Sequence, residues 1–315
     1  MRAVVVQEPG PPENLRLSEL PQPAARRGNI VVRVDAAGVN PVDAGTRADP
    51  YWAEIEPPYV VGYEFAGSVV EVGDGVAGLA ERDLVWGLLP VRGTRWGTYA
   101  QYVEVDARLV GPRPPELDAA SAAGIPLAGS TALQVLDRLA LRPGDSLLVH
   151  GASGGVGTLL VQLARHAGIR VAGTASAARQ TLLEDLGVEW PVDREHGDAV
   201  AAALERRGRR FEAVADLVGH GLLAESLRAI AEGGAAATIV ELRGDFDDAI
   251  DRNITLHGVL VRPARAYLDR LADAVDSGAL VPVVDGVVDF ESIVDAHRRV
   301  ESGRGGGKVI LRIPA

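Results

Sequence analysis

A run of small residues at 151–157, GASGGVG, is the stretch of this chain best suited to hold a ligand. Ala152, Gly154 and Gly157 stand where a dinucleotide-binding turn needs small residues. One permits a sharp bend, one lets the backbone approach a pyrophosphate, and one lets a helix pack closely on a strand. An apolar stretch precedes the run and an apolar face at helical spacing follows it, which predicts a strand, a tight turn and a helix whose free amides face an anion.

The pattern is relaxed to A-x-G-x-x-G, so a glycine-rich turn that binds nothing stays an alternative. The flanking strand and helix favour the dinucleotide interpretation, which assigns these turn residues to the cofactor: Ala152, Ser153, Gly154, Gly155, Val156 and Gly157. A Walker loop is excluded because the only lysine, Lys308, precedes Val309 rather than a serine or threonine. The same lysine cannot complete the Tyr-x-x-x-Lys pair of short-chain dehydrogenases.

The segment VAGTASAARQ at 171–180 indicates which dinucleotide binds. In NAD-binding versions of the motif, a carboxylate at the end of the second strand accepts hydrogen bonds from the ribose 2′-hydroxyl. Here Thr174 stands near that position, and no carboxylate appears before Glu184. Ser176 offers a hydroxyl, and Arg179 offers a guanidinium suited to a phosphate. The pattern predicts NADP(H), although Arg179 could also be a solvated residue at a helix start.

The composition excludes several function classes. A length of 315 residues favours two domains, and a net charge of −11 argues against a nucleic-acid partner. The chain has no cysteine, so it forms neither disulfides nor thiolate metal sites. The N-terminus lacks the apolar core of a signal peptide, and no stretch approaches the roughly 20 apolar residues that span a bilayer. We therefore expect a cytoplasmic protein without a membrane partner.

The elements that must position these residues divide the chain into two domains. Residues 1–118 carry short alternating runs between Gly and Pro, which predicts a β-rich domain of antiparallel strands. Residues 119–261 alternate helical stretches with buried strands, which predicts βαβ units and a doubly wound parallel sheet. These strands are expected at 146–151, 169–176, 211–219, 235–242 and 254–261. The closing strands within 262–315 resemble those of the first domain, so we expect the C-terminus to return to it.

Several blocks in a fixed order cover nearly the whole length. They are AAGVNPVD at 36–43, PPYVVGYEFAGSVVEVGDGV at 57–76, GTYAQYVEV at 97–105, AAGIPLAGSTALQVL at 122–136, GASGGVGTLLVQLA at 151–164, DLVG at 216–219 and GKVIL at 307–311. With these blocks the chain resembles the medium-chain dehydrogenase/reductase superfamily, and within it the zinc-free quinone oxidoreductases related to zeta-crystallin. The resemblance implies an α/β protein in which a GroES-like β domain, built from both chain ends, surrounds an inserted Rossmann domain.

The same resemblance bears on zinc. Zinc alcohol dehydrogenases of the superfamily carry a metal-binding cysteine where this chain has Asn40, and a ligand histidine where it has Tyr63. Neither replacement is a usual zinc ligand, and the four-cysteine structural lobe is missing. The six histidines show no ligand spacing among themselves: His150, His166, His196, His220, His257 and His297. We therefore expect no metal.

The resemblance also implies roles for single residues. Asn40 and Thr131 are expected near the nicotinamide and its ribose, and Gly155 and Val156 on the pyrophosphate. Tyr63 could donate a proton to a substrate carbonyl or only line the pocket, and the second role is favoured because quinone reduction can take its protons from water. The other expected cofactor residues are Leu217, Val218 and Arg262 over the ring, Lys308 at the phosphates, and Arg194 near the 2′-phosphate unless it lies in an exposed loop.

Without a metal to polarise an alcohol, the accessible reaction is hydride transfer from NADPH to an electron-poor small molecule, a quinone or an α,β-unsaturated carbonyl. One alternative is a reductase of a dedicated biosynthetic intermediate, such as an enoyl reductase or an enzyme acting on a polyketide-like molecule. Another is a protein that binds NADPH without turnover. The family commonly forms homodimers through the last Rossmann strand, here within 254–261, although burial inside a monomer would explain its apolar residues equally well.

Overall fold

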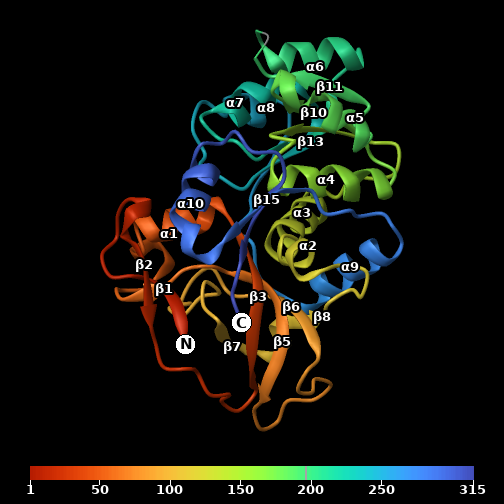
Figure 1. Ribbon diagram of the computed structural model, residues 1–315. Coiled ribbons are helices and arrows are strands. Elements are labelled where there is room, and N and C mark those ends of the chain that lie inside the picture. Colours follow the sequence, from red (N-terminus) through yellow and green to blue (C-terminus); the bar gives the residue numbers. More distant parts are fainter. Residues whose placement is uncertain (196) are drawn as a thin grey trace. The chain divides into compact units, whose positions relative to one another are not determined.

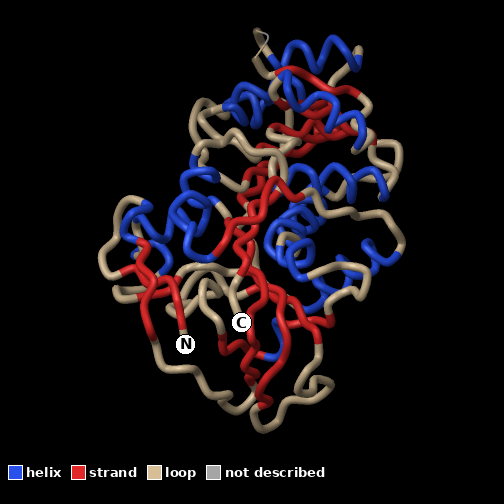
Figure 2. The backbone as a smooth tube through the Cα atoms, in the orientation of Figure 1, coloured by secondary structure: helices blue, strands red, loops and turns tan. Residues whose placement is uncertain are grey.

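The computed structural model describes residues 1–195 and 197–315, and the chain folds into two compact units. Unit 1 comprises Met1–Ser130, Arg262–Ser277 and Pro282–Ala315; unit 2 comprises Thr131–Val261 and Gly278–Val281. Figure 1 shows the elements in chain order, and Figure 2 shows where helices, strands and loops alternate. The helices are α1 (Pro41–Ala48), α2 (Ala119–Ala123), α3 (Pro126–Leu139), α4 (Gly155–His166), α5 (Gln180–Asp185), α6 (Ala199–Arg207), α7 (Leu222–Ser226), α8 (Asp247–Asp251), α9 (Arg265–Asp276) and α10 (Ile293–Glu301).

Unit 1 is built on β-sheet from both ends of the chain. A larger sheet has the order β15-β16-β3-β5-β6-β8, with β7 also paired to β3, and a three-stranded sheet has the order β2-β1-β4. The strands are β1 (Arg2–Val6), β2 (Leu15–Glu19), β3 (Asn29–Val39), β4 (Tyr59–Val60), β5 (Glu64–Val72), β6 (Leu84–Leu88), β7 (Tyr102–Asp106), β8 (Val110–Pro112), β15 (Val284–Asp289) and β16 (Lys308–Arg312). Strand β16 pairs antiparallel with β3, which confirms that the C-terminus returns to the first domain.

Strand β3 is the centre of the larger sheet. Its sequence, NIVVRVDAAGV, is buried along most of its length, and it pairs antiparallel with β5, β7 and β16. In antiparallel pairs the carboxyl end of one strand lies beside the amino end of its partner. The register pairs Ala37 with Phe65 and Val39 with Val309. The end of β3 therefore lies beside the beginnings of β5 and β16.

Unit 2 contains a six-stranded parallel sheet with the order β11-β10-β9-β12-β13-β14. Its strands are β9 (Ser146–His150), β10 (Arg170–Ala175), β11 (Trp190–Asp193), β12 (Phe211–Asp216), β13 (Ile230–Thr238) and β14 (Thr255–Gly258). The chain order reverses at β9, because β10 continues to one side and β12 to the other. This arrangement confirms the expected doubly wound α/β domain.

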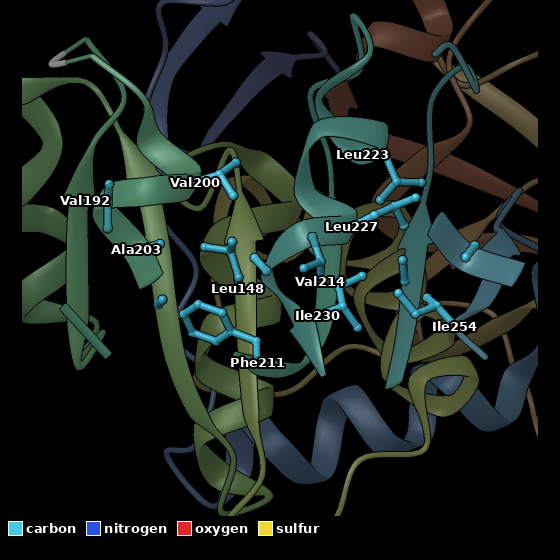
Figure 3. Close-up of a cluster of buried hydrophobic side chains, with 14 residues drawn as sticks. Leu148, Val192, Val200, Ala203, Phe211, Val214, Leu223, Leu227, Ile230 and Ile254 are labelled. Carbon is cyan, nitrogen blue, oxygen red and sulfur yellow. The ribbon is translucent and has the colours of Figure 1, made fainter. Parts of the chain in front are cut away.

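A core fills one face of this sheet. Leu148, Ala172, Val214 and Ala236 are register partners on neighbouring strands, so their side chains form one row. Figure 3 shows Leu148 and Val214 among the buried side chains of this cluster, with Val200 and Ala203 contributed by α6 and Leu223 by α7. The sheet is thus held by apolar contacts on the face opposite to Leu147 and Val149, as period-two alternation requires.

The junction between the units differs from the expected domain boundary. It lies at 130/131, within α3, whereas the texture of the sequence predicts 118/119. Residues 119–130 group with unit 1 because α2 packs on β3 and β5. At the other junction, the Gln162 side chain both donates to and accepts from the backbone of Val281, which groups 278–281 with unit 2. Within residues 1–195 and 197–315, no helix has the length and apolar character needed to cross a membrane.

Candidate functional site

The small residues at 151–157 form the tight turn between β9 and α4 that the sequence predicts. Gly151 has φ +77°, a conformation that favours glycine, and the chain then enters α4 with Gly154 at its N-cap. A Cβ on Gly157 would lie 2.2 Å from the Gly151 carbonyl oxygen and 2.7 Å from the Ala152 Cα. Helix and turn therefore approach so closely that only glycine fits, and the first amides of α4 are left without partners in the helix. This geometry fits a dinucleotide pyrophosphate.

Polar side chains form a row at the carboxyl ends of the parallel strands. His150 on β9 is the register partner of Thr174 on β10 and of Asp216 on β12, and all three are buried. The Ser226 hydroxyl donates its single proton to the Leu222 carbonyl at 2.6 Å, so the His150 Nε2 donates to Ser226 at 2.8 Å. The His150 Nδ1 then accepts from Thr174 at 3.4 Å.

The turn after β12 is shaped by Asp216. Its Oδ1 accepts from the amides of Val218 at 2.9 Å and Gly219 at 3.0 Å, which bends the chain directly after the strand. A Cβ added to Gly151 would lie 2.9 Å from a methyl group of Val218, so the two turns are in contact. Sequence reasoning did not single out Asp216, although an aspartate that ends a strand and precedes a glycine by three residues is a turn signal.

A cavity of about 510 Å³ opens at this end of the sheet. Its lining includes His150 and Thr174 from the strand ends, Val218 from the turn after β12, and the exposed Arg194 from the loop after β11. Such a position, at the switch point of a doubly wound sheet, is where this fold binds ligands. The structure thus brings Thr174, Val218 and Arg194 together, but the Thr174 hydroxyl is engaged by His150 and by the Gly151 amide at 3.3 Å.

Ser176 and Arg179 lie just beyond β10. Ser176 is the N-cap of a short 3₁₀ turn that contains Arg179, and the Arg179 amide donates to the Ser176 carbonyl at 2.9 Å. The Gln180 side chain donates to the carbonyls of Ala175, Ser176 and Val192, so it joins the ends of β10 and β11. Ser176 is the first residue past β10, which ends at Ala175. The sequence did not indicate that Gln180 joins the two strand ends.

In unit 1 the end of β3 leads into α1 through Asn40. The Asn40 backbone amide donates to the Asp43 carboxylate at 2.7 Å, and the Tyr99 hydroxyl donates to the same oxygen at 2.9 Å. The other Asp43 oxygen is buried without a hydrogen-bond partner among the described residues. Burial raises the pKa of the Asp43 carboxyl to about 7, although the bonds from Tyr99 and Asn40 act in the opposite direction.

Asn40, Glu64 and Lys308 meet because the end of β3 lies beside the beginnings of β5 and β16. The Lys308 ammonium donates to Glu64 at 2.7 Å and to the Asn40 amide oxygen, and the Asn40 Nδ2 donates to Glu64 at 2.9 Å. The Lys308 side chain is 6% exposed and that of Glu64 is 0% exposed. The Lys308 ammonium is thus engaged in a buried ion pair inside unit 1, and its assignment to the cofactor phosphates stays a prediction that the further inference replaces with another role.

Tyr63 lies immediately before β5, and its hydroxyl is 2.9 Å from the Thr46 hydroxyl. Thr46 donates its only proton to the Val42 carbonyl at 2.9 Å, so Tyr63 is the donor in the bond between the two hydroxyls. Burial raises the pKa of Tyr63, because the phenolate is poorly solvated there. Tyr63 is therefore a neutral phenol whose proton is held by Thr46.

The remaining predicted residues are placed as follows. Thr131 is buried in α3 at the start of unit 2, Leu217 is half-buried beside Val218, and Ser153 is half-buried in the turn. Arg262 is exposed in unit 1, and its expected place over the nicotinamide ring stays a prediction. Across the described ranges, no group of three or more His, Asp or Glu side chains could hold a metal ion. His196 lies outside these ranges, so its expected lack of a metal role stays a prediction.

Comparison with known proteins places the chain among oxidoreductases. Residues 26–115 match the alcohol dehydrogenase GroES-like domain family, and residues 186–311 match a family described as zinc-binding dehydrogenase. The chain is 34% identical to 2-methylene-furan-3-one reductase of Solanum lycopersicum over 93% of this chain and 74% of that protein. It is 32% identical to the chloroplastic NADPH-dependent alkenal/one oxidoreductase of Arabidopsis thaliana over 99% of this chain and 79% of that protein.

Human quinone oxidoreductase is 30% identical over 99% of this chain and 97% of its own length. Among solved structures, the quinone oxidoreductase of Coxiella burnetii matches with a TM-score of 0.92 at 28% identity, over 100% of this chain and 99% of that one. A mycobacterial protein complexed with NADPH matches with a TM-score of 0.88 at 29% identity, over 99% and 100% of the two chains. The chain also matches 6% of a polyketide synthase from Streptomyces halstedii, at 31% identity over 99% of this chain.

Proposed function

Because the chain belongs to the quinone oxidoreductase branch of the medium-chain dehydrogenase/reductase superfamily, we propose that it is an NADPH-dependent reductase of quinones or α,β-unsaturated carbonyls. The observation that carries the proposal is the turn at 151–157, which leaves no room for a Cβ at Gly157 and ends at the switch point of the unit 2 sheet. Relatives that bear NADPH in their names support the choice of cofactor.

NADPH, when bound, supplies the hydride. The chain's own part is to bind and orient: the first amides of α4 hold the pyrophosphate, and Ser176, Arg179 and Arg194 surround the 2′-phosphate. Asn40 and Thr131 keep their assignment to the nicotinamide and its ribose as part of this proposal. Mixing the purified protein with NADPH and a simple quinone or enone, and following the absorbance of NADPH, tests it. Oxidation of NADPH that depends on the acceptor supports the function; its absence with both acceptor classes overturns it.

We propose that the reaction needs no zinc. Asn40 and Tyr63 stand where the zinc enzymes carry ligands, and two carboxylates lie beside Asn40. That of Glu64 is already bonded to Lys308 and to the Leu127 amide, and that of Asp43 accepts from the Asn40 backbone amide and from Tyr99. An ammonium at 2.7 Å opposes a divalent cation at the Glu64 carboxylate. Activity that survives exhaustive dialysis against a chelator is the expected outcome.

Exchange of Arg179 for alanine should weaken NADPH binding by about 10- to 100-fold, because a charge-assisted hydrogen bond to phosphate is lost. NADH, which has a hydroxyl in place of that phosphate, should bind as before. Fluorescence titration with both dinucleotides measures the two dissociation constants. Arg206, exposed on α6 in the same unit, provides the matched control for loss of one positive charge. An unchanged NADPH affinity in Arg179→Ala would show that the 2′-phosphate is bound elsewhere.

Exchange of Tyr63 for phenylalanine should leave kcat with a simple quinone within about threefold of the wild type, because the Tyr63 proton is already held by Thr46. A general acid contributes roughly 10²–10⁴-fold, so a loss of that size in steady-state kinetics would assign proton donation to Tyr63. Comparison of a quinone with an enone extends the test, since the enone must gain a proton on carbon.

A dedicated biosynthetic acceptor remains the second candidate, favoured by the match over the full length of this chain to a segment of a polyketide synthase. A much higher kcat/KM for an enoyl thioester than for any quinone would support it. Binding of NADPH without turnover of either acceptor class would instead support a non-catalytic protein. We also propose a cytoplasmic homodimer, with β14 at the end of the described sheet available to pair with a second copy.

A further inference from the structure

Lys308 is unusual both in composition and in place. It is the only lysine among the 32 lysine and arginine residues, and all the others are arginines. It is also one of the few buried charged residues, with a side chain that is 6% exposed. An ammonium is a compact charge on a flexible stem, whereas a guanidinium is a broad planar fork, and the two are not interchangeable in a confined site. The geometry around Lys308 explains why this position alone differs.

The space around Lys308 is confined by its neighbours. A Cβ on Gly124 would lie 3.2 Å from the Lys308 Cβ and 3.3 Å from its Cγ, so the lysine stem packs against a glycine backbone. A Cβ on Gly38 would lie 2.1 Å from the Glu64 Oε1 that accepts from Lys308. The backbone of two glycines therefore packs closely against the ion pair. A larger guanidinium in place of the ammonium would displace Glu64 or β3.

The two charges determine the orientation of the Asn40 amide. Lys308 can only donate, and it contacts the Asn40 Oδ1; ionised Glu64 can only accept, and it contacts the Asn40 Nδ2 at 2.9 Å. A flipped amide would set its NH₂ against the ammonium and its oxygen against the carboxylate. Glu64 is held in turn by the Leu127 amide at 2.7 Å. One proton of the Asn40 Nδ2 is left with contacts of only 3.4 Å, to the Gly38 carbonyl and to Asp43.

We propose that Lys308 is a positioning residue, which with Glu64 locks the Asn40 amide in a single orientation so that its remaining N–H serves the reacting end of the bound molecules. This inference rests on the proposed function, and it assigns Lys308 no contact with cofactor phosphate. It predicts that loss of the ammonium impairs the chemical step rather than NADPH binding, and that arginine does not replace lysine.

The test uses the full-length protein with Lys308→Met, Lys308→Arg and the double variant Lys308→Met/Glu64→Gln, which removes both charges if the single variant fails to fold. Single-turnover kinetics should show kcat reduced about tenfold or more in all three, while the NADPH dissociation constant changes less than about threefold. In a double-mutant cycle, Lys308→Met should have no further effect in an Asn40→Ala background. The matched control is Arg207→Met, which breaks the ion pair of the buried Arg207 side chain with the half-buried Glu212 in unit 2 and should leave kcat unchanged.

Three outcomes would overturn the inference. A wild-type kcat in Lys308→Arg would show that arginine can replace lysine at this position. Full recovery of kcat in Lys308→Met/Glu64→Gln shows that only folding was affected. A weaker NADPH affinity with unchanged kcat would indicate that Lys308 contacts the cofactor phosphates instead.

A second readout does not depend on turnover. The chain has four asparagines, so asparagine-selective ¹⁵N labelling gives a side-chain spectrum in which Asn40→Ala identifies the Asn40 signals. These should broaden or shift in Lys308→Met but not in Arg207→Met. If the wild type oxidises no NADPH, the proposed function fails, and this spectrum alone decides whether Lys308 orients Asn40.

Discussion

Replacing Phe211 with alanine should lower the free energy of unfolding by about 3–5 kcal/mol, the range found when a large buried aromatic is truncated. Phe211 begins β12 and is fully buried in the core of unit 2 (Figure 3). Its ring makes an edge-to-face contact with Trp190, with centroids 6.2 Å apart, and lies 4.9 Å from the guanidinium of Arg207. Removal of the ring thus leaves a cavity and also uncovers a cation that packs on it.

Urea unfolding followed by circular dichroism measures this loss. Ile250, 80% exposed on α8 of the same unit, is the matched control, and Ile250→Ala should change the free energy of unfolding by no more than about 0.5 kcal/mol. Phe211→Leu should fall between the two, since leucine refills part of the volume. If Phe211→Ala unfolds at the same urea concentration as Ile250→Ala, the ring does not support the sheet.

Acid should destabilise the protein through two buried histidines, one in each unit. Burial lowers the pKa of His150 to about 4, and burial together with the nearby Arg47 lowers the pKa of His297 to about 3. An unfolded histidine has a pKa near 6.5, so between that value and these lowered ones the unfolded chain binds more protons than the folded one. The contribution of these two histidines to stability is therefore fully present above pH 6.5 and is lost as pH falls towards their lowered pKa values. At pH 5 each histidine lowers the free energy of unfolding by about 2 kcal/mol relative to neutral pH.

Asp43 acts in the opposite sense over part of this range. Its pKa is raised to about 7, so the folded chain binds a proton there that an unfolded aspartate, with a pKa near 3.9, does not. The Asp43 contribution to stability consequently grows as pH falls from 7 towards 4. The wild-type curve is the sum of these effects, so single variants are needed to isolate each histidine.

His150→Gln and His297→Asn keep the polar atom that makes each histidine's shortest hydrogen bond, to Ser226 and to Arg47 respectively. Each variant should reduce the difference in unfolding free energy between pH 7 and pH 5 by about 2 kcal/mol relative to the wild type. His166→Gln, exposed at the end of α4, should leave that difference unchanged. A wild-type pH dependence in both buried variants would mean that the two imidazoles accept protons in the folded state.

The expectations for unit 2 succeeded because its signals are local. The alternation of apolar strands with helical stretches predicted a doubly wound sheet, and the spacing of small residues placed the turn between β9 and α4. The predicted start of one strand was wrong: β13 begins at Ile230 rather than at 235. Gly233 and Gly234 lie inside the strand, where its register with β12 shifts. Glycines that mark a turn in sequence can equally mark an irregular strand.

The cluster around Asn40 could not be predicted in the same way. Lys308 is 268 residues from Asn40 and 244 from Glu64 in sequence, so no spacing rule connects them. Its position after a glycine and before an apolar strand is compatible with a phosphate contact, and only the pairing of β16 with β3 turns the ammonium towards Glu64. The hydroxyl of Thr174 was similarly expected at the cofactor, whereas the neighbouring strand supplies His150 as its partner.

The class of the fold, the place of the turn at 151–157 and the return of the C-terminus to the first domain could all be predicted from local patterns, because periodicity, small residues and strand signals are properties of neighbouring residues. The polar groups that form hydrogen bonds within the protein could be identified only from the folded structure. Burial and hydrogen-bond partners depend on strands that are distant in sequence and adjacent in space. For Lys308, Tyr63 and Thr174, that difference separates a side chain free to meet a ligand from one already bonded to its own protein.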